Sequence, residues 1–144
     1  MRTKAEIAIE DYHEHFNCAQ STLAVFAEDY ELDVKTALRM TSSFGGGCQY
    51  GGICGAIIGS SAVIGLKYGN DTPDRDKYNF NRKKVREFIA IFKEKHGATN
   101  CSDLLGVDME ESDGRDKARA LGLFKTQCAD YVRTSVEILE ELGY

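Results

Sequence analysis

The sequence predicts an all-α protein, a compact bundle of five or six helices around a central glycine-rich helix. Three observations lead to this fold class. The chain has one proline and no tryptophan, few of its segments alternate apolar and polar residues, and apolar residues recur at helical spacing in several stretches. A length of 144 residues suits one domain with a sizeable core, and no repeat or linker divides the chain. We therefore expect a single domain over residues 1–144.

The N-terminal part is expected to form three helices in succession. An apolar stripe runs from Lys4 to Phe16, as on an amphipathic helix. Asn17 is a typical cap residue, and a second periodic run follows it from Cys18 to Tyr30. Asp33 can cap a third helix, which ends near Ser42 before three successive glycines.

A fourth helix is predicted from near Gly51 to about Gly69. Gly51, Gly55 and Gly59 are spaced by four residues and would form one smooth ridge that permits close contact with another helix. A glycine inside a helix costs about 1 kcal/mol relative to alanine, so its repeated use favours a tightly packed central position. The same ridge could instead face a second copy of the chain, which would make the protein a homodimer.

The C-terminal part predicts a long helix, a polar segment and a last helix. The long helix runs from about Asp74 to His96, and we expect its inner face to carry Tyr78, Val85, Phe88, Ile89 and Phe92. Asn100 caps a short turn that ends at Gly106, and residues 108–119 are expected to form a surface loop or a short exposed helix. The last helix spans about Thr126 to Leu142.

Charge and hydropathy exclude two classes of partner. The net charge of −5 argues against nucleic acid, because phosphate binding needs a basic face. The longest apolar run, from Ile53 to Leu66, is too short to cross a bilayer, so no membrane insertion is expected. No signal peptide is visible at the N-terminus, and we expect a cytoplasmic protein.

The stretch from Phe44 to Gly59 is the most unusual part of the chain. It places Cys48 and Cys54 six positions apart among seven glycines. Glycine lets a backbone approach another group closely, so these residues are expected to bring backbone N–H groups to a redox or metal site. The glycines in question are Gly45, Gly46, Gly47, Gly51, Gly52, Gly55 and Gly59.

Four of the five cysteines have similar local settings. Cys18, Cys101 and Cys128 each follow an amide residue and fall in the first turn of a predicted helix, and Cys54 lies in the first turn of another. The start of a helix favours thiolate over thiol, and thiolate is the form that binds metal and attacks disulfides. In a reducing compartment such cysteines indicate metal or redox chemistry. The alternative is that each is a small buried hydrophobic residue.

An ordered set of motifs resembles a known family. The motifs are Asn17-Cys18-Ala-Gln-Ser, Phe44-Gly-Gly-Gly, Cys54-Gly-Ala-Ile-Ile-Gly59, Asn100-Cys101-Ser-Asp-Leu-Leu-Gly106 and the late Cys128. Together they are similar to the C-GCAxxG-C-C family of small redox-active proteins. The resemblance implies a helical redox domain related to one in split-Soret cytochromes, with functional cysteines at positions 18, 54, 101 and 128. It also implies an iron–sulfur cluster, whereas Cys48 is an addition to the family pattern.

These observations leave four functions open. The first is electron transfer or redox sensing through a cluster of the [2Fe–2S] type, with an unknown redox partner protein. The second is metal-free thiol–disulfide chemistry with the same cysteines or with Cys48 and Cys54. The third is a structural zinc site with four cysteine ligands. The fourth is a small-ligand or anion-binding module at the turn from Gly45 to Gly52. No motif of a hydrolase or metalloprotease is present, so whether the chain is an enzyme stays open.

Overall fold

Helices account for all of the regular structure, which confirms the predicted all-α class. The computed structural model describes residues 1–144. The α-helices are α1 (Lys4–His13), α2 (Cys18–Ala27), α3 (Val34–Thr41), α4 (Gly55–Tyr68), α5 (Arg75–His96), α6 (Cys101–Leu105), α7 (Gly114–Ala120) and α8 (Gln127–Glu141). A short 3-10 segment, η1 (Glu28–Tyr30), follows α2, and a tight turn, η2 (Gly47–Gly51), precedes α4.

Two short helices raise the number above the five or six expected. The segment after Asn100 forms α6, although the Asn100 side chain makes no capping hydrogen bond. The polar stretch expected to be a loop or a short exposed helix contains α7.

The fourth helix begins four residues later than predicted. Its first residue is Gly55 rather than Gly51, because four successive residues before it, from Gly46 to Gln49, have positive φ angles. A left-handed backbone cannot continue into a right-handed helix, so η2 remains a separate turn. Gly51 therefore lies in this turn and not on the helical ridge.

Side-chain caps determine where several helices start. Thr3 and Asn17 each form a reciprocal capping box with the third residue of α1 and α2. Asp33 and Asp74 accept hydrogen bonds from backbone N–H groups in the first turns of α3 and α5. Such caps satisfy N–H groups that have no partner within the helix. The boundaries predicted at these residues agree with the structure to within one residue.

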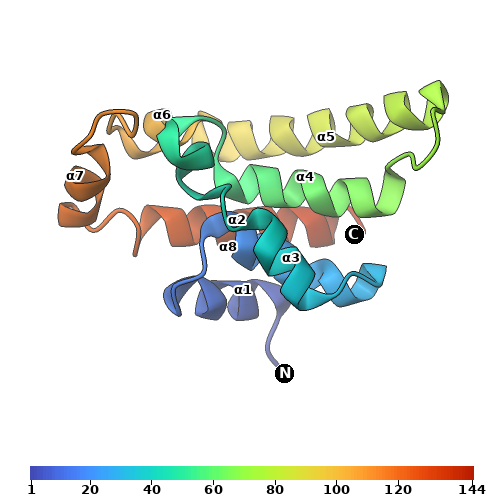
Figure 1. Ribbon diagram of the computed structural model, residues 1–144, viewed down its shortest axis with the longest axis horizontal. Helices are drawn as coiled ribbons and strands as arrows, with labels where there is room; N and C mark the ends of the chain where they lie inside the picture. The colour runs from blue at the N-terminus through green and yellow to red at the C-terminus, as the bar shows by residue number, and fades with distance from the viewer.

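Helix α4 occupies the centre of the bundle, as predicted (Figure 1). It packs against α2, α5 and α8, while α1 covers the opposite side of α2 and α8. The core around it contains Phe26, Ile57, Ile64, Phe88, Phe92, Val132 and Leu139, all fully or almost fully buried. Tyr78 was expected to face inward, and this expectation was wrong. Its side chain is 56% exposed.

The glycine ridge of α4 faces α2 of the same chain. A Cβ at Gly59 would lie 2.7 Å from the carbonyl oxygen of Ala19, and a Cβ at Gly55 would collide with the Cys18 sulfur. The two helices therefore approach each other at a distance that only glycine permits. The glycine ridge that could have faced a second copy of the chain is therefore occupied by α2.

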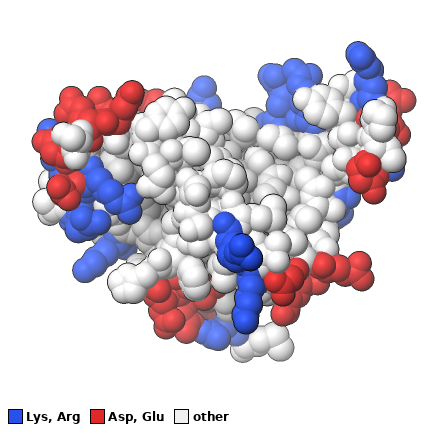
Figure 2. Space-filling view, viewed as in Figure 1, with Lys and Arg blue, Asp and Glu red and all other residues white.

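Charged side chains lie mainly around the edges of the molecule in Figure 2, and its middle is mostly uncharged. At the end occupied by α7, basic and acidic groups lie next to each other. None of the helices combines the length and the apolar composition needed to cross a membrane.

Candidate functional site: a four-cysteine cavity

Cys18 is the first residue of α2, and its position depends on Asn17. The Asn17 side chain accepts a hydrogen bond from the Gln20 N–H, and its amide group donates one to the Ser42 carbonyl, with 2.9 Å between nitrogen and oxygen. This second bond connects the start of α2 to the segment that leads into the glycine-rich turn. The Cys18 sulfur then lies against Gly55, the residue that follows Cys54.

Backbone hydrogen bonds join the two segments that carry Cys54 and Cys101. The Cys54 N–H donates to the Thr99 carbonyl at 2.8 Å, and the Cys101 N–H donates to the Gly52 carbonyl at 2.6 Å. Between these two bonds, Ile53 and Asn100 form an antiparallel bridge. Cys54 is the N-cap residue of α4 and Cys101 is the first residue of α6. Two segments nearly fifty residues apart in sequence thus place their cysteines at diagonal positions of one antiparallel bridge.

Cys128 is brought to the same region by α8. It is the second residue of this helix, one turn before Tyr131. The Tyr131 hydroxyl donates a hydrogen bond to the Leu104 carbonyl in α6, with 3.0 Å between the oxygens. This bond connects the first turns of α8 to the helix that begins with Cys101. In Figure 1 the starts of α4 and α8 lie at the same end of the molecule, next to α6 and α7.

The four cysteines line one cavity of about 950 Å³. Cys54, Cys101 and Cys128 are buried, Cys18 is partly buried, and all are free thiols. Cys48 is exposed and is not part of the lining. The chain therefore brings together the four positions singled out from sequence and leaves the fifth cysteine outside.

The glycines of the turn perform different structural tasks around this cavity. Gly45, Gly46 and Gly55 belong to its lining. A Cβ at Gly47 would collide with the backbone of Gly52, and a Cβ at Gly51 would collide with Ser102 in α6. Gly59 lies farther along α4 and permits its contact with α2. The turn folds tightly on itself and against α6, which fixes the segment that leads to Cys54 relative to α6.

Burial keeps the four thiols protonated when no metal is bound. Burial raises the pKa of Cys18, raises that of Cys54 well above its usual value, and raises the pKa of Cys101 to about 11 and of Cys128 to about 12. Ionisation of one cysteine would raise the pKa of the others further, as Cys18 does for Cys54, Cys101 and Cys128. The preference for thiolate at a helix N-terminus is therefore outweighed in the metal-free protein, because desolvation is the larger effect.

Some nearby groups act in the opposite direction. Backbone N–H groups of Gly46, Ala19 and Ala56 face the Cys18 sulfur and favour its thiolate. The positive charge of Arg115 does the same for Cys101 and Cys128, although burial has the largest effect on both. The cavity therefore contains groups that stabilise negatively charged sulfur, as a bound metal would require.

The sequence analysis missed the opposite wall of the cavity. Arg115 and Arg119 of α7, Phe124 in the following connection, and Tyr12 of α1 all belong to the lining. Residues 108–119 were expected to be a solvent-exposed segment, and no short motif distinguishes them. One signal was present in the sequence: two arginines four residues apart share a helix face.

No group of three or more His, Cys, Asp or Glu side chains is arranged to hold a single metal ion. The four cysteines instead share the lining of one larger cavity.

Comparison with known proteins identifies the family. The family model described as "Putative redox-active protein (C_GCAxxG_C_C)" matches residues 16–142, nearly the whole chain and all of the cavity cysteines. No curated protein and no solved structure matches the chain. The order of the four cysteines, their shared cavity and the extent of this match lead to one conclusion: the chain belongs to the C-GCAxxG-C-C family of redox-active proteins.

Proposed function

We propose that the protein transfers electrons or senses redox state through an iron–sulfur cluster of the [2Fe–2S] type, held by Cys18, Cys54, Cys101 and Cys128. One observation carries this proposal: cysteines from four different helices line one cavity, and the fifth cysteine of the chain does not. Thiolates are the usual protein ligands of such clusters. The protein would exchange its electrons with a separate redox protein, and the free cysteines fit a reducing compartment such as the cytoplasm.

The size of the cavity, about 950 Å³, suits a cluster better than one metal ion. A structural zinc site would need the four sulfurs around a single point. A [2Fe–2S] cluster divides its four protein ligands between two iron ions, so its ligands need not surround one point. The cavity also has no carboxylate in its lining and contains arginines, which suits a group of negative charge.

Thiol–disulfide chemistry without metal is the second candidate. Its support is that Cys18 lies against Gly55, directly beside Cys54, and that both are free thiols. Formation of a disulfide from two thiols would release two protons and two electrons to an acceptor. The alternative pair of Cys48 and Cys54 has less support, because Cys48 is exposed outside the cavity that contains Cys54.

Metal and sulfide analysis of anaerobically purified protein separates these candidates. The cluster predicts a coloured sample with visible absorption and equal amounts of iron and acid-labile sulfide. A colourless, metal-free sample that loses two titratable thiols on mild oxidation would favour the disulfide. One equivalent of zinc without sulfide would favour the structural site, and either result would contradict the cluster.

A further inference from the structure

The lining of the cavity carries positive charge, although the protein as a whole is acidic. The chain contains 23 Asp and Glu residues against 18 Lys and Arg residues. No Asp or Glu nevertheless lines the cavity, whereas Arg115, Arg119 and Lys125 do. A concave wall of one charge sign raises the local concentration of ligands of the opposite sign. The cavity is therefore electropositive in an acidic protein.

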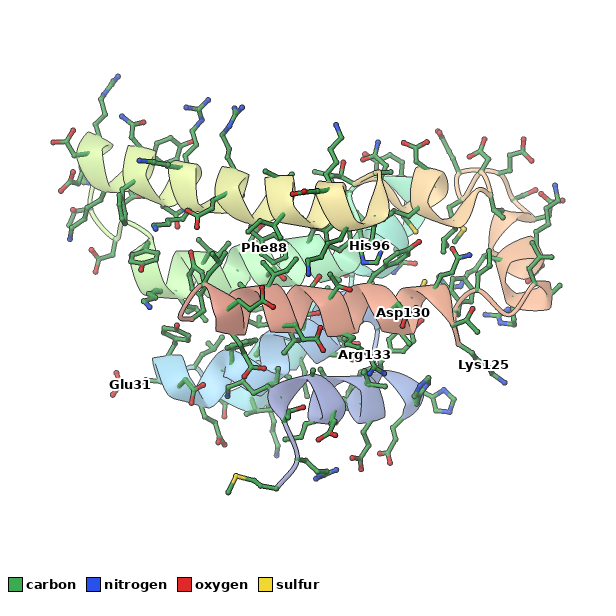
Figure 3. All side chains as sticks on the ribbon, turned by 180° about the vertical axis from the view of Figure 1, so that it is seen from behind. Glu31, Phe88, His96, Lys125, Asp130 and Arg133 are labelled. Atoms are coloured by element: carbon green, nitrogen blue, oxygen red, sulfur yellow. The ribbon has the colours of Figure 1, made fainter.

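Arg115 and Arg119 form a pair directed at one aromatic ring. They lie four residues apart on α7, and their guanidinium carbons are 5.4 and 5.9 Å from the centre of the Phe124 ring. Stacking on an aromatic face holds a guanidinium in place while its N–H groups remain free to bind an anion. The Lys125 side chain extends away from the helices at the start of α8 (Figure 3), so the two arginines are the better ligands.

Arg115 is the more available of the two. It makes no side-chain hydrogen bond or ion pair, although it extends toward the glycine turn, where a Cβ at Gly46 would lie 3.5 Å from its Nη1 atom. Arg119 interacts with a single carboxylate, that of Asp116 on its own helix, at 3.4 Å and at the surface. Arginine presents paired N–H donors that match the oxygens of carboxylates and phosphates. Neither guanidinium has a strong internal partner that an incoming anion would have to displace.

We propose that this cavity binds a small molecule that carries at least two negative charges on carboxylate or phosphate groups. Arg115 and Arg119 hold the charged end, and the rest of the molecule lies toward the thiols beside Tyr12 and Tyr131. The volume of about 950 Å³ is in the range of small-molecule sites. The binding site itself does not depend on the proposed redox function. Only the role of the bound molecule, as a reactant or regulator of the cysteine site, rests on that function.

Isothermal titration calorimetry with pyrophosphate and with citrate tests this site. The protein is used as purified anaerobically, and neutral trimethyl citrate serves as the uncharged control ligand. We expect at least one of the two anions to bind, with an affinity that falls as salt is added, and trimethyl citrate to show no binding. Binding of pyrophosphate alone would identify a phosphate ligand, and binding of citrate alone a carboxylate ligand.

Two matched sets of variants show where the anion binds. Arg115→Gln and Arg119→Gln should each weaken binding about tenfold or more, since a hydrogen bond to a charged group is lost. Arg133→Gln is the control, because Arg133 is an exposed arginine midway along α8 (Figure 3) and does not line the cavity. Absence of binding by both anions, or equal binding by all three variants, would overturn the proposal.

The same samples distinguish failure of this site from failure of the redox function. Iron, sulfide and thiol content are measured on each variant before titration. Intact iron and sulfide with no anion binding would overturn the binding site alone, and would show that the arginines serve only to balance the charge of the cluster. Anion binding lost in the arginine variants, in a protein without metal or redox-active thiols, would support the binding site and overturn the redox proposal.

Discussion

Replacement of Gly59 by alanine tests the close contact between α2 and α4 that places Cys18 beside Cys54. In an open helix this change would stabilise the protein by about 1 kcal/mol, because alanine is the better helix former. At Gly59 the new Cβ would lie 2.7 Å from the Ala19 carbonyl oxygen and 3.1 Å from the Thr22 Cβ. Both atoms are held by α2, so the helices must move apart. Overpacking of this kind costs about 1–3 kcal/mol, and we expect a net loss of about 1–2 kcal/mol.

The matched control is Gly65→Ala in the same helix. No atom lies within 4 Å of a Cβ built at Gly65, so only the gain in helix propensity applies. For a chain of this length, 1 kcal/mol corresponds to about 3 °C in the melting temperature. Thermal unfolding followed by circular dichroism should therefore show a decrease of about 3–6 °C for Gly59→Ala and an increase of about 2–3 °C for Gly65→Ala. Equal stabilisation by both substitutions would refute the close packing of α2 on α4.

Four further predictions follow from the caps and the buried titratable groups. In the metal-free protein iodoacetamide at pH 8 should modify exposed Cys48 first and Cys128 slowly. The folded chain retains the Cys128 proton to higher pH than the unfolded chain, so the free energy of unfolding should fall above about pH 9. Equal free energies of unfolding from urea titrations at pH 8 and pH 10 would contradict this. Asn17→Ala should cost about 1 kcal/mol for the lost cap, and more than Thr3→Ala, because Asn17 also binds a carbonyl in another segment; equal losses of stability in denaturant would show that this link contributes nothing. Burial lowers the pKa of His96, so the unfolded state binds its proton more readily and the free energy of unfolding should fall as the pH drops below about 6.5. This pH dependence, measured by urea unfolding, should be weaker in His96→Gln, and an unchanged dependence would show that His96 does not cause it.

Local signals in the sequence were sufficient for most of the helices. Asn17, Asp33 and Asp74 are cap residues whose effect is confined to one helical turn, and each was placed correctly. The buried position of Phe88 and Phe92 on α5 likewise follows from their spacing of four residues. Tyr78 has the same apparent periodicity but is exposed, and in this part of α5 it is Phe80 that contacts the Tyr68 ring of α4. Sequence spacing alone does not show which of these residues faces the partner helix.

The start of α4 was misplaced because the decisive property is the handedness of the backbone. Cys48 and Gln49 take φ angles of 59° and 70°, which non-glycine residues rarely adopt. Neither cysteine nor glutamine is a residue type that predicts this backbone conformation. It depends on the tight contact of Gly47 with Gly52, which a periodicity argument does not include.

The four cysteines singled out from the sequence all line the cavity, and burial has a larger effect on their ionisation than the helix starts. The position of each thiol at the start of a helix is a local property, and it favours a thiolate. Burial is a property of the whole fold, and its effect on the pKa of Cys101 and Cys128 is larger. The arginines of α7 were missed for the same reason, since only the folded chain brings them to the cysteine cavity.

Anaerobic titration with dithionite, followed in the visible spectrum, tests most directly whether Cys18, Cys54, Cys101 and Cys128 form one redox site. The wild-type protein and each single Cys→Ser variant are compared, after circular dichroism has shown that the variants are folded. We predict that every substitution at these four positions removes or alters the reducible chromophore and that Cys48→Ser leaves it unchanged. A chromophore that survives substitution at any of the four, or that is lost in Cys48→Ser, would contradict a redox centre held jointly by these thiols.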